Sequence, residues 1–353
     1  MKISDHIISQ EATLLEALNR LNATRSFTLF AVDADERVVG SITDGDIRRA
    51  LIAGVKLDDK IEGVCHRSFR FIDAANQATP KLLKEIRQSG IHLIPYIDEN
   101  GRIARLIDLT KIKGLLPIDG VLMAGGRGER LQPLTDNCPK PLLPLGGKPI
   151  VEHNVDRMLS YGIDNITFSV RYLGEQIKNY FGNGEKWNAT IGYVDEDAPL
   201  GTIGAVSKID NFKNDTVLVM NSDLFTNIDL EEFYNHFIET GSDMAVASIP
   251  YNVSVPYAVM QTTDDNVVTS FQEKPTFTYY SNGGIYLIKR SVLSKLKRNA
   301  HCDATDLMQR LINDGCRVTC FPIVGYWIDI GRHEDYKKAQ DFIKYTKLLK
   351  CCI

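Results

Sequence analysis

The sequence has no apolar run long enough to cross a bilayer, no secretion signal at its start, and no two cysteines in the Cys-x-x-Cys spacing. The first two absences make a cytoplasmic location without a membrane partner the expectation. The seven cysteines are odd in number, so we expect reduced thiols rather than disulfides or a zinc site. The net charge is only −4, and this balance excludes the basic surface that nucleic-acid binding requires.

The 353 residues are enough for two domains, each with its own core. An internal repeat occupies residues 1–113, and strands and helices alternate from Asp119 onward. Between them stand Gly114 and Pro117, which break a continuing helix. We therefore expect a linker at residues 114–118 and a second domain over residues 119–353.

The first 113 residues repeat with an offset of 65. The segment 32–39, VDADERVV, matches the segment 97–104, IDENGRIA. Each copy follows a helical pattern of apolar residues and places a β-turn between two short apolar strands. The first copy ends in Thr43-Asp44-Gly45-Asp46, where another helix is predicted to begin.

This repeat resembles a tandem CBS pair, a module that often binds adenine or guanine nucleotides. The resemblance implies that Thr43 and Asp46 hold the phosphate side and the ribose of a purine nucleotide. In the second copy Asp108 and Lys111 stand at the matching positions, and a lysine offers no acceptor to ribose hydroxyl groups. We therefore expect at most one nucleotide per chain. Two other roles remain open: Asp46 caps a helix, or the pair joins chains into a homo-oligomer.

From Asp119 onward the alternation of strands and helices predicts an α/β domain with a mainly parallel sheet. The expected strands are 119–123, 165–170, 190–194 and 216–220, and the expected helices are 150–161, 174–181 and 203–209. Ligands of such sheets bind at the carboxyl ends of the strands. Gly125 and Asp223 each follow a strand, so we expect them to meet at one edge of the sheet.

The stretch 122–145 begins at the end of an apolar strand and continues into three closely spaced glycines, Gly125, Gly126 and Gly128. Glycines after a strand allow backbone N–H groups to surround an anion without obstruction by a Cβ atom. Arg130 and Lys140 then add two positive charges. Bare amides and two cations are suited to a polyphosphate.

Two common phosphate-binding motifs do not fit this stretch. A Walker A loop requires Ser or Thr after Gly-Lys, and Pro149 stands there. A dinucleotide fingerprint requires a third glycine where Leu131 stands. What remains, GGxGxRLxPLT followed by PKPL, resembles the signature of the sugar-1-phosphate nucleotidyltransferases. The alternative is a tight glycine turn with surface charges.

Further segments match this family in its order along the chain: LGTIGA at 200–205, NSD at 221–223, EKP at 273–275, NGGIY at 282–286 and WIDIG at 327–331. The resemblance implies a place beside the base and sugar for Gly201. It implies that Glu273 contacts sugar hydroxyl groups, that Lys274 contacts the sugar phosphate, and that Asn282 lies near the sugar. The expected fold is a CBS pair followed by a Rossmann-like mixed sheet.

Asp223 ends a hydrophobic strand, and Asp329 is followed by an isoleucine and a glycine. Mg²⁺ prefers oxygen ligands, usually one or two carboxylates together with substrate phosphates and water. An aspartate after a strand is by itself often a helix cap, and Asp329 stands shortly before a predicted helix. The resemblance favours Mg²⁺ at both aspartates.

The implied reaction transfers a nucleotidyl group from an NTP to a sugar 1-phosphate, with GTP favoured. Arg130, Lys140 and Lys274 would neutralise phosphate charge, because transfer at phosphorus depends on positioning and electrostatics. A thymidylyl- or uridylyltransferase of the same fold is one alternative. A catalytically inactive nucleotide sensor is another. No acyltransferase repeat is expected, because the chain ends in a charged helix at 334–349.

Overall fold

The computed structural model describes residues 2–24, 27–73 and 80–351. The chain divides into two compact units, Met1–Leu115 and Leu116–Ile353. The boundary falls inside the segment 114–118 that the sequence marks as a linker. Among the described residues, every helix is too short or too polar to traverse a lipid bilayer.

The first unit holds a three-stranded sheet β1-β2-β3 and a separate antiparallel pair β4-β5. In the sheet, β1 is parallel and β3 is antiparallel to the central β2. The elements in chain order are η1 (Ile3–His6), β1 (Ile7–Ser9), α1 (Leu14–Thr24), β2 (Thr28–Val32), β3 (Val38–Thr43), α2 (Asp44–Ile52), η2 (Ile61–Gly63), α3 (Pro80–Gln88), β4 (Leu93–Ile97) and β5 (Ile103–Asp108).

The offset of 65 residues recurs in the backbone of this unit. Adding 65 to the bounds of β2 and β3 gives the bounds of β4 and β5. A parallel bridge between Ile72 and Tyr96 takes the place of the parallel pairing of β1 with β2. Each half buries a cluster of its own, around Leu14 and Ile47 in the first and around Leu83 in the second. The repeat is therefore present in the structure as well as in the sequence.

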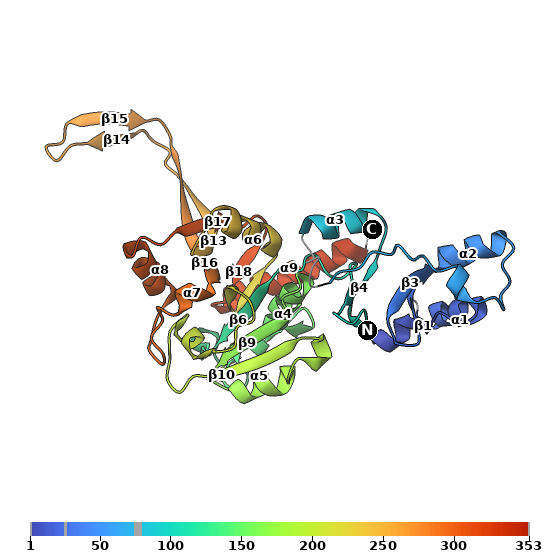
Figure 1. Ribbon diagram of the computed structural model, residues 1–353. Helices are drawn as coiled ribbons and strands as arrows, with labels where there is room; N and C mark the ends of the chain where they lie inside the picture. The colour runs from blue at the N-terminus through green and yellow to red at the C-terminus, as the bar shows by residue number, and fades with distance from the viewer. Residues whose placement is uncertain (1, 25–26, 74–79, 352–353) are drawn as a thin grey trace. The chain divides into compact units, whose positions relative to one another are not determined.

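The second unit is built on a seven-stranded mixed sheet in the order β10-β9-β6-β11-β16-β13-β17 (Figure 1). The strands β10, β9, β6 and β11 are mutually parallel, whereas β16 is antiparallel to both of its neighbours. The strand bounds are β6 (Ile118–Ala124), β9 (Asn165–Val170), β10 (Thr190–Asp195), β11 (Thr216–Asn221), β13 (Met244–Ser254), β16 (Thr276–Lys289) and β17 (Val318–Pro322).

Helices and three small antiparallel pairs surround this sheet. The helices are α4 (Ile150–Ser160), α5 (Gly174–Phe181), α6 (Leu230–Glu239), α7 (Arg290–Leu293), α8 (Ala304–Asn313) and α9 (His333–Cys351), and the 3₁₀ helices are η3 (Glu129–Leu131), η4 (Lys140–Leu142), η5 (Glu185–Trp187) and η6 (Gly204–Lys208). The small pairs are β7 (Pro144–Leu145) with β8 (Lys148–Pro149), β12 (Leu224–Thr226) with β18 (Trp327–Asp329), and β14 (Val259–Thr262) with β15 (Val268–Gln272).

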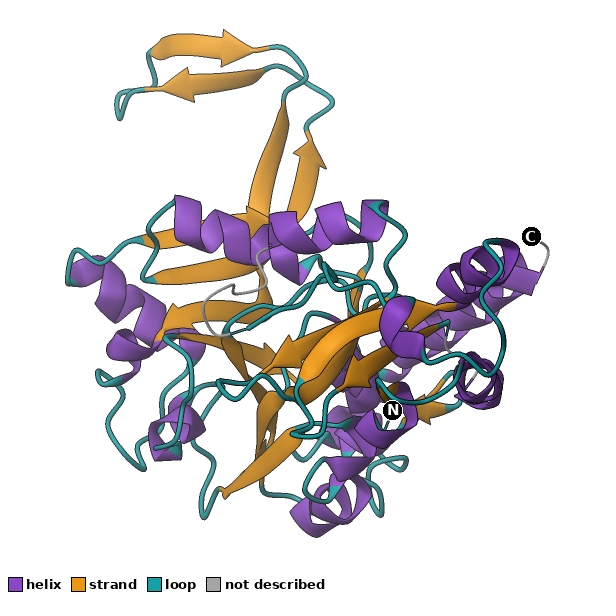
Figure 2. Ribbon diagram, turned by 45° about the vertical axis from the view of Figure 1, so that its right-hand side comes forward, coloured by secondary structure: helices purple, strands orange, loops and turns teal. Residues whose placement is uncertain are grey.

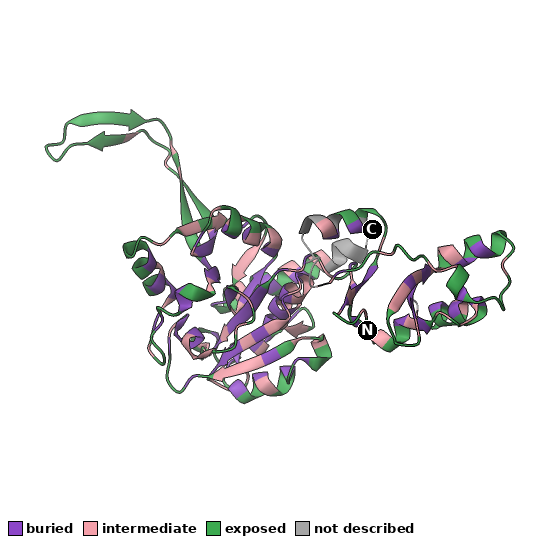
Figure 3. Ribbon diagram, viewed as in Figure 1, coloured by how far each residue is buried: buried purple, intermediate pink, exposed green. Residues whose placement is uncertain are grey.

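Both faces of the sheet are covered, which explains why its central strands read as continuous apolar runs. Leu122 packs with α4, α5 and α6 in one cluster, whereas its neighbour Val121 packs with η6, α7 and α8 in another. Successive strand residues point to opposite faces, so both side chains are fully buried. Figure 3 shows this burial in the central strands. The expected strands and α/β class are confirmed, and the helix expected at 203–209 is the 3₁₀ helix η6 (Gly204–Lys208) rather than an α-helix.

The strands β13 and β16 continue past the sheet as a two-stranded ribbon that carries the β14–β15 hairpin (Figures 1 and 2). None of residues 250–282 is buried. The sequence does not predict this projection. The strands of the ribbon alternate apolar and polar residues, and a strand that packs against a core on one face shows the same pattern.

Asp119 joins three segments at the amino end of β6, opposite the edge where the candidate site lies. Its carboxylate is fully buried and accepts hydrogen bonds from the Asn165 side chain at 2.8 Å and from the Asn214 backbone at 2.8 Å and side chain at 3.1 Å. A buried donor that loses its acceptor keeps its full desolvation cost. Asp119 is therefore a structural carboxylate.

We predict that Asp119→Ala lowers the free energy of unfolding by about 3 kcal/mol, because several donors lose their acceptor together. Denaturant unfolding monitored by circular dichroism measures this loss. The matched control is Asp215→Ala, whose side chain is 91% exposed and pairs with Arg290 at the surface. The control should cost under about 1 kcal/mol. Equal losses in the two variants would contradict the structural role.

Candidate functional site

The loops that follow β6 and β11 lie side by side at the carboxyl edge of the sheet. Because the two strands are parallel neighbours, Asn221 is in register with Met123. The Ser222 hydroxyl and backbone N–H both donate to the Met123 carbonyl, at 2.7 and 3.2 Å. The sequence prediction that Gly125 and Asp223 meet at one edge follows from this pairing.

The glycine-rich loop after β6 is shaped by contacts on one side and open on the other. Gly128 adopts a left-handed φ of +68°, and a Cβ atom there would lie 3.0 Å from the Cβ atom of Lys140. The Thr135 hydroxyl donates to the Gly128 carbonyl at 2.9 Å and holds this conformation. A Cβ atom built on Gly126 would meet no atom within 4 Å. The loop therefore presents backbone at Gly126 to a space that a ligand can enter.

Two cations and two carboxylates gather beside this loop: Arg130, Lys140, Asp223 and Asp329. The Lys140 ammonium group is bonded to the Asp223 carboxylate, and Lys140 is only 9% exposed. Asp329 ends β18 and pairs with Leu224 in β12, so it lies next to Asp223. The Ile330 N–H also donates to the Asp223 carbonyl at 3.1 Å.

Arg130 reaches the same place from η3. A Cβ atom built on Gly331 would lie 3.5 Å from an Arg130 guanidinium nitrogen and 3.7 Å from an Asp329 carboxylate oxygen. Arg130 and Asp329 therefore flank the glycine of the WIDIG segment. Four charged residues, predicted from three separate motifs, are brought together by the fold.

The pKa of the Asp329 carboxyl group is raised. Desolvation by the surrounding atoms is the larger cause, although part of the residue is solvent-exposed, and the negative charge of Asp223 adds to the shift. Lys140 and Arg130 act in the opposite direction. The negative charge of Asp223 beside Asp329 fits a divalent cation, because the charge of the cation relieves this repulsion. Both are oxygen ligands of the kind that Mg²⁺ prefers.

Glu196 is a residue of the site region that no sequence motif indicated. It follows β10, is 8% exposed, and accepts hydrogen bonds from the Ser169 hydroxyl and from the Leu200 N–H at 3.1 Å. A Cβ atom on Gly125 would lie 2.5 Å from its carboxylate. Glu196 therefore holds the ends of β6, β9 and β10 together. Its one sequence signal is a carboxylate just after a strand, as at Asp223.

Gly201 and Thr202 pack against the segment that leads into α8. Gly201 has a φ of +78°, and a Cβ atom there would lie 2.6 Å from the Cys302 carbonyl oxygen. The Thr202 N–H donates to the Asp303 carboxylate at 2.9 Å, and the Thr202 hydroxyl accepts from the Ala304 N–H at 2.8 Å. The glycine is thus required for packing against the connection between α7 and α8, and the Thr202 N–H group already has a hydrogen-bond acceptor.

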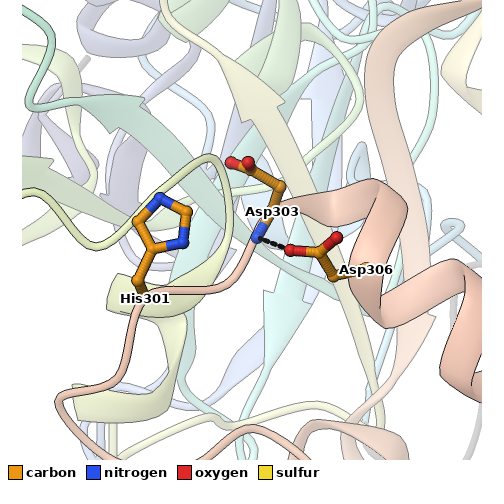
Figure 4. A group of neighbouring side chains, drawn as sticks. All are labelled: His301, Asp303 and Asp306. Atoms are coloured by element: carbon orange, nitrogen blue, oxygen red, sulfur yellow. Dashed lines mark hydrogen bonds between the residues drawn. The ribbon is translucent and has the colours of Figure 1, made fainter.

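His301, Asp303 and Asp306 form a group whose potential ligand atoms all lie within 4.8 Å of one another (Figure 4). Asp303 and Asp306 form the capping box of α8, and the Asp303 N–H donates to the Asp306 carboxylate at 3.1 Å. Asp303 also accepts from Thr202. Capping and packing account for both carboxylates.

The sugar-side residues are distributed along the projecting ribbon. Asn282 lies at its base, where its side-chain oxygen accepts from the Gly284 N–H at 2.9 Å. Gly284 is close to β11, since a Cβ atom there would lie 2.7 Å from the Asn221 side chain. Glu273 and Lys274 precede β16 at the far end, about 20 Å along the strand from Asn282 at the usual rise per residue. Both are exposed. The chain's own fold therefore does not bring them to Asp223.

Residues 119–346 match the family described as Nucleotidyl transferase. The chain belongs to this family. Residues 3–53 match the CBS domain. The family match covers the glycine-rich loop, the four charged residues and the ribbon, so the recognition made from the motifs is confirmed for both families.

Curated relatives carry several activities in their names. The chain is 29% identical to a mannose-1-phosphate guanylyltransferase of Mycobacterium tuberculosis over 63% of each chain. It is 31% identical to the bifunctional protein GlmU of Methanocaldococcus jannaschii, over 64% of this chain and 54% of the relative. It is 29% identical to a D-glycero-alpha-D-manno-heptose 1-phosphate guanylyltransferase of Aneurinibacillus thermoaerophilus, over 65% and 99%. The chain thus spans 63% and 54% of the length of the first two relatives.

Among solved structures, a protein of Bacillus anthracis provisionally assigned as a glucose-1-phosphate thymidylyltransferase matches with a TM-score of 0.52. The two chains are 24% identical, and the match covers 64% of this chain and 95% of the other. This likeness shows that the second unit has the fold of that protein.

We predict that Asp329→Asn raises the melting temperature of the metal-free protein at neutral pH. A carboxyl group whose pKa is raised in the folded state destabilises that state once the pH exceeds the raised pKa, and the asparagine removes this effect. The gain should shrink as the pH falls and vanish below the ordinary aspartate pKa of about 4, because the wild-type carboxyl group is then protonated in both the folded and the unfolded state. Calorimetry in the presence of a chelator measures both.

Addition of Mg²⁺ supplies the internal control for this experiment. The wild type should gain stability from a cation that binds the folded state, and Asp329→Asn should gain less. A variant that melts below the wild type without metal would contradict the repulsion assigned to the two aspartates.

Proposed function

We propose that this chain transfers a nucleotidyl group from an NTP, with GTP favoured, to a sugar 1-phosphate and releases pyrophosphate. The observation that carries the proposal is the set of two cations and two carboxylates beside an open glycine-rich loop. Two of the relatives above are named as guanylyltransferases, which supports GTP. A uridylyltransferase of Synechocystis is 29% identical over a similar span, so UTP is the alternative to compare.

In the proposed reaction, a phosphate oxygen of the sugar 1-phosphate forms a bond to the α-phosphorus of the NTP. The bond from that phosphorus to the oxygen that bridges to the β-phosphate breaks, and pyrophosphate leaves with the electron pair. The attacking phosphate is already ionised at neutral pH, so no general base is required. Such a transfer depends on positioning and on neutralising charge.

The residues divide between the two substrates. The amides of the loop at Gly125, Gly126 and Gly128 would receive the triphosphate, with Arg130 beside the leaving pyrophosphate and Lys140 beside the α-phosphate. Gly201 would lie beside the base and sugar of the nucleotide. Glu273, Lys274 and Asn282 would bind the sugar 1-phosphate, with Lys274 facing its phosphate.

Asp223 and Asp329 would hold Mg²⁺. When bound, the cation would polarise the α-phosphoryl group and neutralise developing charge. Lys140 is already bonded to Asp223, so the carboxylate and the ammonium group orient each other before any substrate arrives. Asp329 would bind the cation in its ionised form, so cation binding would counteract the rise in its pKa.

We predict that Asp223→Ala lowers turnover by roughly a hundredfold or more, since loss of charge stabilisation costs about 3 kcal/mol. Release of pyrophosphate, measured with each NTP against a panel of sugar 1-phosphates, tests both the reaction and the base.

Asp210→Ala is the control, because Asp210 forms an exposed pair with Arg298 at 2.7 Å. Thermal melting of both variants excludes unfolding as the cause. Activity of Asp223→Ala within about threefold of wild type would contradict the metal assignment, and an inactive wild type would favour the nucleotide sensor.

We also propose that residues 1–113 form a tandem CBS pair that binds one purine nucleotide and joins chains into a homo-oligomer. A cavity of about 1590 Å³ within the first unit supports the nucleotide, and its lining includes Thr43, Asp46, Asp108 and Lys111. Thr43 and Asp46 also form a capping box at α2, and Asp46 pairs with Arg49 at 2.6 Å. In the second copy Asp108 pairs with Lys111 at 3.4 Å. A lysine therefore stands where the first copy offers the carboxylate of Asp46.

We predict that Asp46→Asn removes one bound purine nucleotide per chain from the full-length protein. An aspartate accepts from both ribose hydroxyl groups, and an asparagine presents a donor to one of them. Calorimetric titration with adenine and guanine nucleotides measures the change in stoichiometry. Asp44→Asn is the matched control, because Asp44 lies two residues before Asp46, carries the same charge and also lines the cavity. Unchanged stoichiometry in Asp46→Asn would leave that residue as a helix cap only.

A further inference from the structure

The projecting ribbon has an apolar face and a polar face. Tyr251 is in register with Tyr279, and Val253 with Phe277, and residues opposite each other or two apart share one face. The pairs between them, Asn252 with Thr278 and Ser254 with Thr276, make the other face polar. A strand pair with this alternation is built to be covered on its apolar side.

The ribbon and its hairpin are largely exposed to solvent (Figure 3). Large apolar side chains that are 37–75% exposed lie along the ribbon and its hairpin: Tyr251, Val253, Tyr257, Met260, Val267, Val268, Phe271, Tyr279 and Tyr280. A two-stranded hairpin is marginal in water without a further strand or helix against it. Exposed apolar patches of this extent mark interaction surfaces.

Glu273 and Lys274 lie at the elbow between the hairpin and the ribbon. The elbow is closed by the Val255 N–H, which donates to the Pro275 carbonyl at 3.0 Å. Lys274 has a φ of +42°, a backbone conformation that residues other than glycine adopt mainly at turns and functional sites. Neither side chain has a hydrogen bond or an ion pair with any residue that the structure describes. Glu273 and Lys274 are the residues that the proposed reaction assigns to the sugar 1-phosphate. They therefore lie exposed at the elbow, without a hydrogen bond or an ion pair to the described residues.

The base of the ribbon is fixed to the body. The Trp327 indole N–H donates to the Gly283 carbonyl at 2.9 Å, and the Ser248 hydroxyl donates to the Phe321 carbonyl at 3.2 Å. A Cβ atom on Gly283 would lie 2.6 Å from the Ala247 carbonyl oxygen, so the two strands are closely packed there. The ladder then runs without a shift from Ser248 to Ser254. Folding the elbow back onto its own site would break these bonds or bend this ladder.

We propose that the ribbon docks on a second copy of this chain and delivers Glu273 and Lys274 to the Asp223 site of that copy. The inference rests on the proposed function, which requires a cation for the sugar phosphate. Lys140 is paired with Asp223, and Arg130 lies beside Asp329, so both cations already face carboxylates. A second copy carries the same incomplete site, and a reciprocal exchange completes both.

The area available fits such an exchange. Tyr251, Val253 and Tyr279 on the apolar face, with the paired Met260 and Phe271 of the hairpin, would bury about 500 Å² per ribbon at roughly 100 Å² each. With the surface that each ribbon covers, a reciprocal exchange of two ribbons would bury about 2,000 Å² in total, which is the size of a stable interface. Because β16 is antiparallel to β11, the ribbon leaves the sheet at the carboxyl edge of β11, where the candidate site lies. The ribbon and the candidate site of one chain therefore lie at the same edge of the sheet, as a reciprocal exchange between two copies requires.

Complementation between two inactive variants tests the proposal. Asp223→Ala and Lys274→Ala chains are co-expressed with different tags, and mixed oligomers are purified through both tags. Each variant alone should show about 1% of wild-type turnover or less. In the mixed dimer, the Lys274→Ala chain keeps its Asp223 and receives an intact Lys274 from the other chain, so about half of wild-type activity should return.

Two controls share this design. Mixed oligomers of Asp223→Ala with Lys140→Ala should stay inactive, because both residues belong to the same body and no exchange restores a site.

Adding Tyr251→Ser and Tyr279→Ser to both chains of the Asp223→Ala and Lys274→Ala pair should abolish its complementation. Adding Ile238→Ser and Ile312→Ser, which remove exposed apolar groups from the body at 54% and 52% exposure, should preserve it. Absence of complementation with an active wild type overturns the proposal.

A cross-linking experiment separates this proposal from the proposed function. A photoreactive phenylalanine analogue replaces Phe271 in the full-length chain, and equal amounts of ¹⁴N- and ¹⁵N-labelled protein are co-assembled before irradiation. Mixed-isotope cross-links from the hairpin to the second unit of another chain support docking, even where no sugar 1-phosphate is a substrate. Cross-links only within one isotope, a monomeric wild type, or no cross-link overturn it.

Discussion

The bond between the Lys140 ammonium group and the Asp223 carboxylate is the interaction on which the candidate site depends. Lys140 is 9% exposed, and a buried lysine without a partner carries a large desolvation cost. Asp223 offsets that cost, and it can do so because β11 ends directly beside the loop that follows β6. The Lys140 side chain in turn limits the residue type at position 128, because a Cβ atom on Gly128 would lie 3.0 Å from the Cβ atom of Lys140. One ion pair thus fixes the glycine-rich loop against the neighbouring strand.

Much of this arrangement is readable from the sequence, for physical reasons that differ between elements. The strand 165–170 and the helix 174–181 have the predicted bounds, because apolar periodicity and a following glycine delimit them. Likewise, the strands of the first unit recur at the offset of 65 found in the sequence. The sequence predicts Asp223 at the ligand-binding edge of the sheet, because it follows a strand and ligands of parallel sheets bind where strands end.

Other features depend on contacts that no local pattern reveals. Glu196 joins three segments that are distant in sequence, through Ser169, Leu200 and the space left by Gly125. Asp119 has the same character at the opposite edge of the sheet. The expected α-helix at 203–209 is a 3₁₀ helix. Gly201 and Gly204 pack tightly there, since a Cβ atom on Gly201 would lie 2.6 Å from the Cys302 carbonyl oxygen and one on Gly204 would lie 2.5 Å from that of Ala300. Tertiary packing decided these cases.

The direction of β16 explains why the EKP segment, although it follows the family's order, lies away from the site. A strand parallel to β11 would begin at the opposite edge, but β16 is antiparallel and begins beyond the carboxyl edge. Its fourteen residues exceed what the sheet can pair, so its first part must extend with β13 into solvent. The motifs follow the family's order along the chain, whereas the direction and length of β16 decide where the EKP segment lies in space. Glu273 and Lys274 are therefore exposed beyond the sheet edge at which Asp223 lies, at the end of a ribbon whose apolar face no described part of the chain covers.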